Sequence, residues 1–134
     1  MHHPWRRFRD QWGHVALAVT PLPEDFHALT DGRTVWLHTP LLQAERRCAI
    51  EHEMIHLERD EHCAQDEAVE RRTDQEVGRR LIPWESLLRE VRWARSESEL
   101  AEELWVTEKV LRARAETLRA DELMELARVA HWSV

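Results

Sequence analysis

Short apolar runs separated by turn residues dominate the first third of the chain. Residues 14–19 are largely apolar and are followed by two prolines, and residues 34–38 form a second run of β-branched and aromatic side chains. Asp31-Gly32 lies between this second run and residues 26–29, and glycine tolerates the positive φ that tight hairpin turns require. The pattern predicts a small antiparallel sheet.

The remainder of the chain has the pattern of helices. Thr39-Pro40 is typical of an N-cap followed by proline at the first helical position, and residues 41–59 then contain no glycine or proline. Residues 60–65 are polar and predict a loop, after which a second helix is expected over 66–81, before Pro83. Four shorter helices are expected over residues 84–93, 97–104, 107–118 and 121–131. The sequence therefore predicts an α+β fold, with a small antiparallel sheet packed on two long helices and a short helical C-terminal region.

Composition limits the class of protein. The 134 residues are 43% apolar and include seven tryptophans, enough for the core of one compact domain. The net charge of -7 opposes nonspecific binding to a polyanion. No apolar run approaches the length of a membrane span, so we expect a cytoplasmic protein. Cys48 and Cys63 are too few for a disulfide-stapled scaffold and are expected to be reduced, although their pairing stays open.

The strongest chemical signal is His52-Glu53-Met54-Ile55-His56, within the first long helix. Positions i and i+4 place both imidazoles on one helix face, about 5–6 Å apart, where they can share one metal ion. The carboxylate of Glu53 could take a proton from a water activated by that ion. The alternative is two ordinary solvated or core histidines. The uncharged gap and the apolar back of the helix favour the metal site.

A catalytic zinc site needs a third protein ligand and one open position. Glu67, Glu70 and Asp74 share one face of the second long helix. In an antiparallel hairpin of the two helices, Glu70 lies at the same depth as His56, so Glu70 is the favoured ligand and Glu67 its main rival. Asp74, one turn further on, could accept the other ring N–H of a bound histidine, most simply His52. A solvated acidic face is the plainer alternative, because arginines are interspersed along this helix.

Several other residues are candidates for binding a metal, lining a cleft or stabilising an oxyanion. His62 and Cys63 in the predicted loop could also bind a metal, whereas Cys48 is better explained as a small buried residue. Trp36 in the strand beside the helix is a candidate for lining a cleft. The chain has no tyrosine, so another group must stabilise an oxyanion. The candidates are His14, His27, His38, His62 or an arginine.

These motifs resemble the ImmA/IrrE-type family of phage and bacterial zinc metallopeptidase-like proteins. The similar stretches are DGRTVWL at 31–37, ERRCAIEHEMIHLER at 45–59, and ERRTD at 70–74 followed by RRLIP at 79–83. They look most like the short, arginine-rich actinobacterial and actinophage members. The resemblance implies a zinc-peptidase fold with His52, His56 and Glu70 as ligands and Glu53 as base. It also implies that the target is a transcriptional repressor, whose cleavage or inactivation derepresses phage, mobile-element or stress genes.

The chain departs from that family pattern in two places. The connection between His56 and Glu70 is shorter than in many relatives, which would reshape one wall of a cleft. Glu58 stands where many zincins carry an apolar residue, which predicts a more exposed helix end. On this reading residues 1–84 form a zincin-like metallopeptidase core and residues 85–134 a C-terminal helical segment.

The C-terminal segment contains a helix-turn-helix-like pattern over residues 100–114. From residue 96 to 119, six glutamates outnumber four basic side chains, which does not favour contact with DNA. We expect a packing or partner-binding element. Two functional hypotheses follow: a zinc metallopeptidase that cleaves a repressor, and a non-proteolytic, zinc-stabilised module that binds or sequesters one. Glu53 discriminates between them, because a structural zinc site needs no base.

Overall fold

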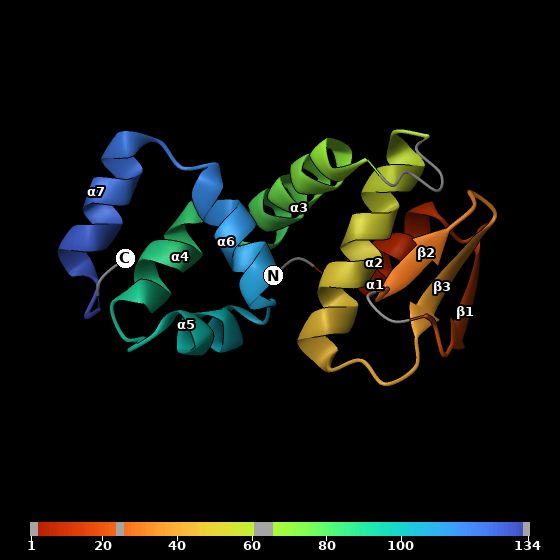
Figure 1. Cartoon of the computed structure of the whole chain (residues 1–134), viewed down its shortest axis with the longest axis horizontal. Coiled ribbons are helices and arrows are strands. Elements are labelled where there is room, and N and C mark those ends of the chain that lie inside the picture. Colours follow the sequence, from red (N-terminus) through yellow and green to blue (C-terminus); the bar gives the residue numbers. More distant parts are fainter. Residues whose placement is uncertain (1–2, 24–25, 61–65, 133–134) are drawn as a thin grey trace. The chain divides into compact units, whose positions relative to one another are not determined.

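The computed structural model of the chain describes residues 3–23, 26–60 and 66–132 (Figure 1). Within this part of the chain it has seven helices and a small three-stranded sheet, so the predicted α+β class is confirmed. The chain divides into two compact units, residues 1–73 and 74–134, and the division falls within helix α3. The elements are α1 (Pro4–Gln11), β1 (Ala16–Thr20), β2 (Ala28–Thr30), β3 (Thr34–His38), α2 (Gln43–Glu58), α3 (Glu67–Leu81), α4 (Trp84–Val91), α5 (Glu97–Leu104), α6 (Glu108–Glu116) and α7 (Ala120–Val129).

The sheet is mixed, and the prediction of an antiparallel sheet is wrong for β1. The strand order is β1-β3-β2. Strand β1 pairs with β3 in parallel, with Ala16 opposite Thr34 and Thr20 opposite His38, whereas β2 pairs with β3 antiparallel. The chain leaving β1 therefore reaches the opposite edge of the sheet before the hairpin returns it to the middle. A hairpin signal reports only the pairing of strands that are neighbours in sequence, so it could not reveal this crossover.

The predicted hairpin between β2 and β3 is confirmed. One side-chain oxygen of Asp31 accepts hydrogen bonds from the backbone N–H groups of Arg33, at 2.8 Å, and Thr34, at 2.9 Å. Gly32 has a φ of 90°, a conformation that L-residues with a side chain rarely adopt. These bonds hold the turn that sets the register of β3.

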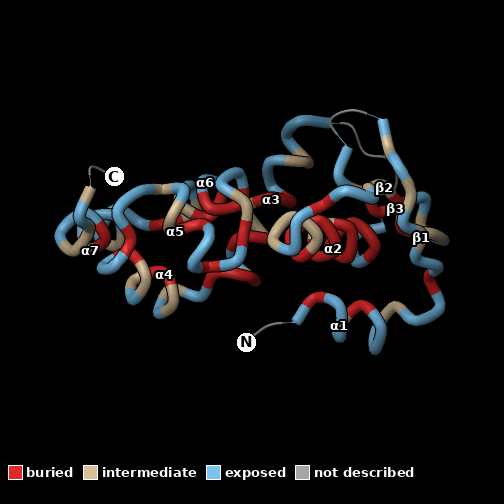
Figure 2. The backbone as a smooth tube through the Cα atoms, turned by 90° about the horizontal axis from the view of Figure 1, so that it is seen from below, coloured by how far each residue is buried: buried red, intermediate tan, exposed pale blue. Residues whose placement is uncertain are grey.

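The core of the N-terminal unit lies between β3 and α2. Val35 and Leu37 from the strand and Ile50 and Met54 from the helix are all at most 1% exposed and belong to one apolar cluster. Figure 2 shows buried positions along most of α2. Alternation along β3 turns the intervening Trp36 to the other face of the sheet. Trp36 therefore does not face the helix that bears the histidines, which does not favour Trp36 as a residue that lines a cleft beside them.

Helix α2 begins later than predicted. Thr39 and Pro40 form a turn, and the first helical residue is Gln43. The side chain of Glu45 accepts a hydrogen bond from the backbone N–H of Leu42 at 2.8 Å, which satisfies one of the donors left open at a helix start. The glutamate in the first turn, rather than the Thr-Pro pair, marks this N-terminus.

Helix α1 was not predicted from the sequence pattern. Only Pro4 and Phe8 of its residues are buried. Helices this short are marginal without tertiary contacts, so local propensity gives little signal. Arg7 supplies such contacts, because its guanidinium pairs with Glu51 at 2.8 Å and also with Glu58, both on α2.

The C-terminal unit contains the last turns of α3 and helices α4 to α7. A Cβ on Gly78 of α3 would lie 2.9 Å from the Cβ of Arg114 on α6, so glycine permits this close approach. The buried guanidinium of Arg114 donates to the carbonyl of Ile82 at 2.8 Å, just beyond the end of α3. Trp105, in the turn between α5 and α6, has a left-handed φ of 58°. None of the helices among the described residues combines the length and apolar character needed to cross a membrane.

Candidate metal centre

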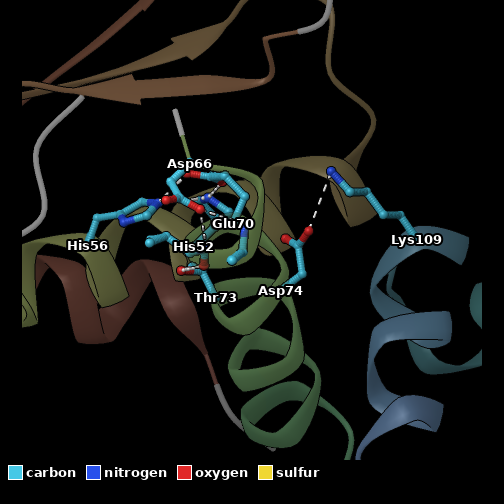
Figure 3. Close-up of polar contacts among 9 residues, drawn as sticks. His52, His56, Asp66, Glu70, Thr73, Asp74 and Lys109 are labelled. Carbon is cyan, nitrogen blue, oxygen red and sulfur yellow. Dashed lines mark hydrogen bonds and ion pairs between the residues drawn. The ribbon is translucent and has the colours of Figure 1, made fainter. Parts of the chain in front are cut away.

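Two histidines and one glutamate converge in the N-terminal unit (Figure 3). The Nε2 atoms of His52 and His56 lie 3.0 Å apart. The carboxylate of Glu70 reaches both, with Oε2 at 2.7 Å from His52 Nε2 and Oε1 at 3.1 Å from His56 Nε2. The three ligand atoms all lie within 4.8 Å of one another, so this group could hold a metal ion.

Helix α2 places the two histidines. Their i and i+4 spacing brings the rings onto one face, with centroids 4.7 Å apart and planes inclined by 71°. Between them, Met54 and Ile55 are fully buried, as the uncharged gap in the motif predicts. The apolar side chains that embed α2 in the core therefore also fix the direction of the imidazole pair.

The start of helix α3 places the glutamate. Asp66 caps this helix, since its side chain accepts backbone hydrogen bonds from Ala68 at 2.8 Å and Val69 at 3.3 Å. The N–H of Glu70 donates to the backbone carbonyl of Asp66 at 3.0 Å, closing the first turn. Thr73 is fully buried and its hydroxyl donates to the carbonyl of Val69 at 2.8 Å. The cap and this buried side chain fix the turn that presents Glu70.

The pKa values of Glu70 and Glu53 are shifted in opposite directions. Partial burial raises the pKa of Glu70, but hydrogen bonds and charge interactions with His52 and His56 outweigh it and lower the pKa to about 2. Glu53 is 4% exposed, and burial raises its pKa above the usual 4.5 against the opposing effect of the two histidines. Glu70 is therefore a carboxylate at neutral pH, as a metal ligand must be, while Glu53 has a raised affinity for a proton.

The structure distinguishes the acidic candidates on α3. Glu67, the rival third ligand, is exposed and does not belong to the group formed with the histidines. Asp74 pairs through Oδ2 with the Nζ atom of Lys109 on α6 at 3.4 Å (Figure 3). The hydrogen bond expected between His52 and Asp74 stays a prediction.

The other candidates have different surroundings. Cys48 is buried, in agreement with its interpretation as a small core residue. His62 and Cys63 lie outside the described residues, as does most of the predicted loop over 60–65. Among the histidines considered for oxyanion stabilisation, His27 lies 3.5 Å from Glu45, His38 Nδ1 accepts the backbone N–H of Leu22 at 2.9 Å, and the ring of His14 lies 5.8 Å from that of Trp12. None of these three belongs to the metal-binding group found among the described residues.

The charged contacts between α1 and α2 were not predicted from the sequence. Glu51 is completely buried beside the first histidine of the motif, and Arg7 balances its charge at 2.8 Å. Glu58, the charged residue near the end of α2 that predicted a more exposed helix end, is the second partner of Arg7. Arg47, one turn before Glu51, is also buried; desolvation lowers its pKa and the charge of Glu51 opposes that shift. The i, i+7 spacing of the two glutamates was the available signal, because it places both on one helix face.

Two imidazole nitrogens and one carboxylate are three ligands that a divalent metal ion could share. On a four-coordinate ion, three protein ligands would leave one position open. No protein-family model, curated protein or solved structure matches this chain.

Proposed function

We propose that this chain is a zinc-dependent metallopeptidase that acts on a protein substrate, and that the substrate is a transcriptional repressor of a phage, prophage or mobile element. The convergence of His52, His56 and Glu70 within 4.8 Å, with Glu53 next in sequence to the first ligand, carries the proposal. The choice of a repressor as substrate rests on the resemblance to the ImmA/IrrE-type family.

The residues of the site have distinct roles in this proposal. His52, His56 and Glu70 would hold the zinc ion, and the low pKa of Glu70 keeps it a charged ligand at neutral pH. When bound, zinc supplies Lewis-acid activation of the attacking water and of the scissile carbonyl. Glu53 would accept a proton from the attacking water and return it to the leaving amine, a role suited to a carboxyl whose pKa is raised by burial.

The sheet offers a place for an extended substrate. Strands β1 and β2 are the edges of the described sheet, and an extended peptide can add to an exposed edge through backbone hydrogen bonds. Of the two edges, β2 is the one that contacts α2, the helix that carries both histidines (Figure 1). We therefore place an extended substrate at the β2 edge.

The test compares wild-type protein with Glu53→Gln in cells that carry the relevant repressors. New protein N-termini are identified by mass spectrometry, and a reporter gene follows derepression. We expect a repressor to be cut, and its promoter derepressed, only with the wild type. A Glu53→Gln protein that derepresses as well as the wild type, with no new N-terminus, would overturn the peptidase and favour a zinc-stabilised module that sequesters the repressor.

A further inference from the structure

The C-terminal unit has two adjoining surface cavities along α4 and the end of α7. One, of about 430 Å³, is lined by Arg92, Trp93, Arg128, Val129 and His131. The other, of about 420 Å³, is lined by Trp84, Glu85, Leu88, Arg89, Arg92 and Trp93. Arg92 and Trp93 belong to both, so the two cavities form one continuous surface, here called the α4–α7 groove. All of its residues belong to a single compact unit.

Apolar side chains dominate the chemistry of the groove. Trp93 is 74% exposed, an unusual state for the largest apolar side chain. Trp84, Leu88 and Val129 are half-buried around it. A contiguous exposed apolar patch of this kind is typical of a surface that binds another molecule, and tryptophan and arginine are the residues most enriched among energetic anchors of interfaces.

Arginine is the main charged residue among those that line the groove. Arg89, Arg92 and Arg128 line it together with one carboxylate, that of Glu85. The lining therefore presents guanidinium groups around an apolar centre, which favours a partner that carries carboxylates beside apolar side chains.

All three arginines already interact with carboxylates. Arg89 lies 3.1 Å from Glu90 and Arg128 lies 2.6 Å from Glu125, whose charge also interacts with that of Arg92. The side chains of Arg89 and Arg128 are 65% and 67% exposed, and ion pairs at such exposed positions are weak because water and salt screen them. Both guanidiniums can therefore exchange these partners for carboxylates of an incoming molecule.

We infer that the α4–α7 groove binds an acidic amphipathic segment of a protein partner. The apolar residues of the segment cover Trp84, Leu88 and Trp93, and its carboxylates meet Arg92 and Arg128. A single-stranded nucleic acid would also use tryptophan and arginine, but it has no apolar side chains for Leu88 and Val129, and the net negative charge of the chain opposes a polyanion. Binding of a partner at the α4–α7 groove does not depend on the proposed peptidase activity.

Binding can be measured by fluorescence anisotropy with labelled peptides on the full chain. The probe is a 15-residue peptide with leucines at i, i+3, i+4 and i+7 spacing and glutamates elsewhere. We expect saturable binding that weakens with added salt and at least tenfold upon Arg92→Glu/Arg128→Glu or Trp93→Ser. Arg95→Glu, an exposed arginine outside the groove lining, is the matched control and should bind as the wild type does. Circular dichroism checks that each variant is folded.

Three comparison probes test whether binding requires the negative charge and the apolar residues of the peptide. Replacing the glutamates of the peptide by lysines, or its leucines by serines, should each abolish binding. Equal binding of the lysine peptide, or no binding of the glutamate peptide, would overturn the inference. Tighter binding of a 15-nucleotide oligo-dT than of the glutamate peptide would reassign the groove to nucleic acid, and a dimer lost upon Trp93→Ser would reassign it to self-association. Glu70→Ala should leave peptide binding unchanged, so failure of the metal site and failure of this inference are distinguishable.

Discussion

Glu70 Oε2 lies 2.7 Å from His52 Nε2, although the two residues come from different helices. With His56 at 3.1 Å from the other carboxylate oxygen, the three ligand atoms form a compact triangle. Ligand atoms on a tetrahedral zinc ion, at bond lengths near 2.1 Å, are about 3.4 Å apart. The three side chains are therefore somewhat closer together than in a site that holds zinc, and they would move apart to admit the ion.

Replacing Glu53 by glutamine should stabilise the metal-free protein at neutral pH. Burial raises the pKa of Glu53, so the native state binds a proton more tightly than the unfolded chain. Stability then falls as pH rises from the unfolded pKa of about 4.5 through the folded value, because the buried carboxyl must ionise. In the presence of a chelator, Glu53→Gln should raise Tm by a few degrees at pH 7.

At lower pH the effect of Glu53→Gln on Tm should disappear. Below about pH 4.5 the carboxyl is protonated in both states, so the difference in Tm between Glu53→Gln and wild type should shrink towards zero. Glu67→Gln, at an exposed position on α3, is the control and should not change Tm at either pH. If Glu53→Gln melts at a lower temperature than the wild type at pH 7, the charged form of Glu53 stabilises the folded protein, which contradicts this prediction.

The sequence was most informative where one local rule decides the structure. The i, i+4 spacing of the histidines predicts that they share one helix face, provided that the segment is helical. The absence of glycine and proline over residues 41–59 was enough to predict that helix. Glu70 followed from matching depths in two antiparallel helices joined by a short connection. Asp66, the cap that fixes the depth of Glu70, lies at the first residue of the predicted second helix.

The ion pairs of Arg7 should stabilise the N-terminal unit. Removing the guanidinium leaves Glu51, which has no exposed side-chain area, without this compensating charge. We expect Arg7→Met to lower the free energy of unfolding by about 1–3 kcal/mol, less than for a fully buried pair because Arg7 is 24% exposed. Urea unfolding measures the change.

Two further variants isolate the cause. Arg7→Met/Glu51→Gln should recover part of the lost stability, because it removes the buried charge that Arg7 balances. The recovery is partial because the buried Arg47 loses its interaction with the charge of Glu51. Arg9→Met, 74% exposed and 3.6 Å from Asp10, should stay within about 0.5 kcal/mol of wild type. If Arg7→Met unfolds at the same urea concentration as Arg9→Met, the contact does not stabilise α1 on α2.

Gly78 should resist substitution although it lies inside a helix. Helix propensity alone predicts that Gly78→Ala stabilises the chain by about 1 kcal/mol. A Cβ at this position would instead lie 2.9 Å from the Cβ and 3.0 Å from the Cα of Arg114. We expect the clash to dominate, with a loss of about 1–3 kcal/mol in thermal or urea unfolding.

A position without this crowding provides the comparison for Gly78. Ser98→Ala, exposed on α5, should change the free energy of unfolding by no more than about 0.5 kcal/mol. A more stable Gly78→Ala protein would mean that α6 does not approach α3 this closely.

The features that the sequence did not reveal all depend on contacts between distant segments. The parallel pairing of β1 with β3 needs a crossover that no local turn signal encodes. Helix α1 has two buried side chains and depends on Arg7, whose partners are distant in the sequence. The presence of Gly78 inside a helix, despite its low helix propensity, is explained by the close approach of Arg114, which leaves no room for a Cβ atom. In each case a tertiary contact outweighed the local pattern.

The most direct test of the metal centre is the metal content of the purified protein by elemental mass spectrometry. Wild type, Glu70→Ala and Glu67→Ala are loaded with zinc and dialysed equally against a weak chelator. We predict one zinc per chain in the wild type and in Glu67→Ala, and loss of most of it in Glu70→Ala. No zinc in the wild type, or full retention by Glu70→Ala, would contradict a site built from His52, His56 and Glu70.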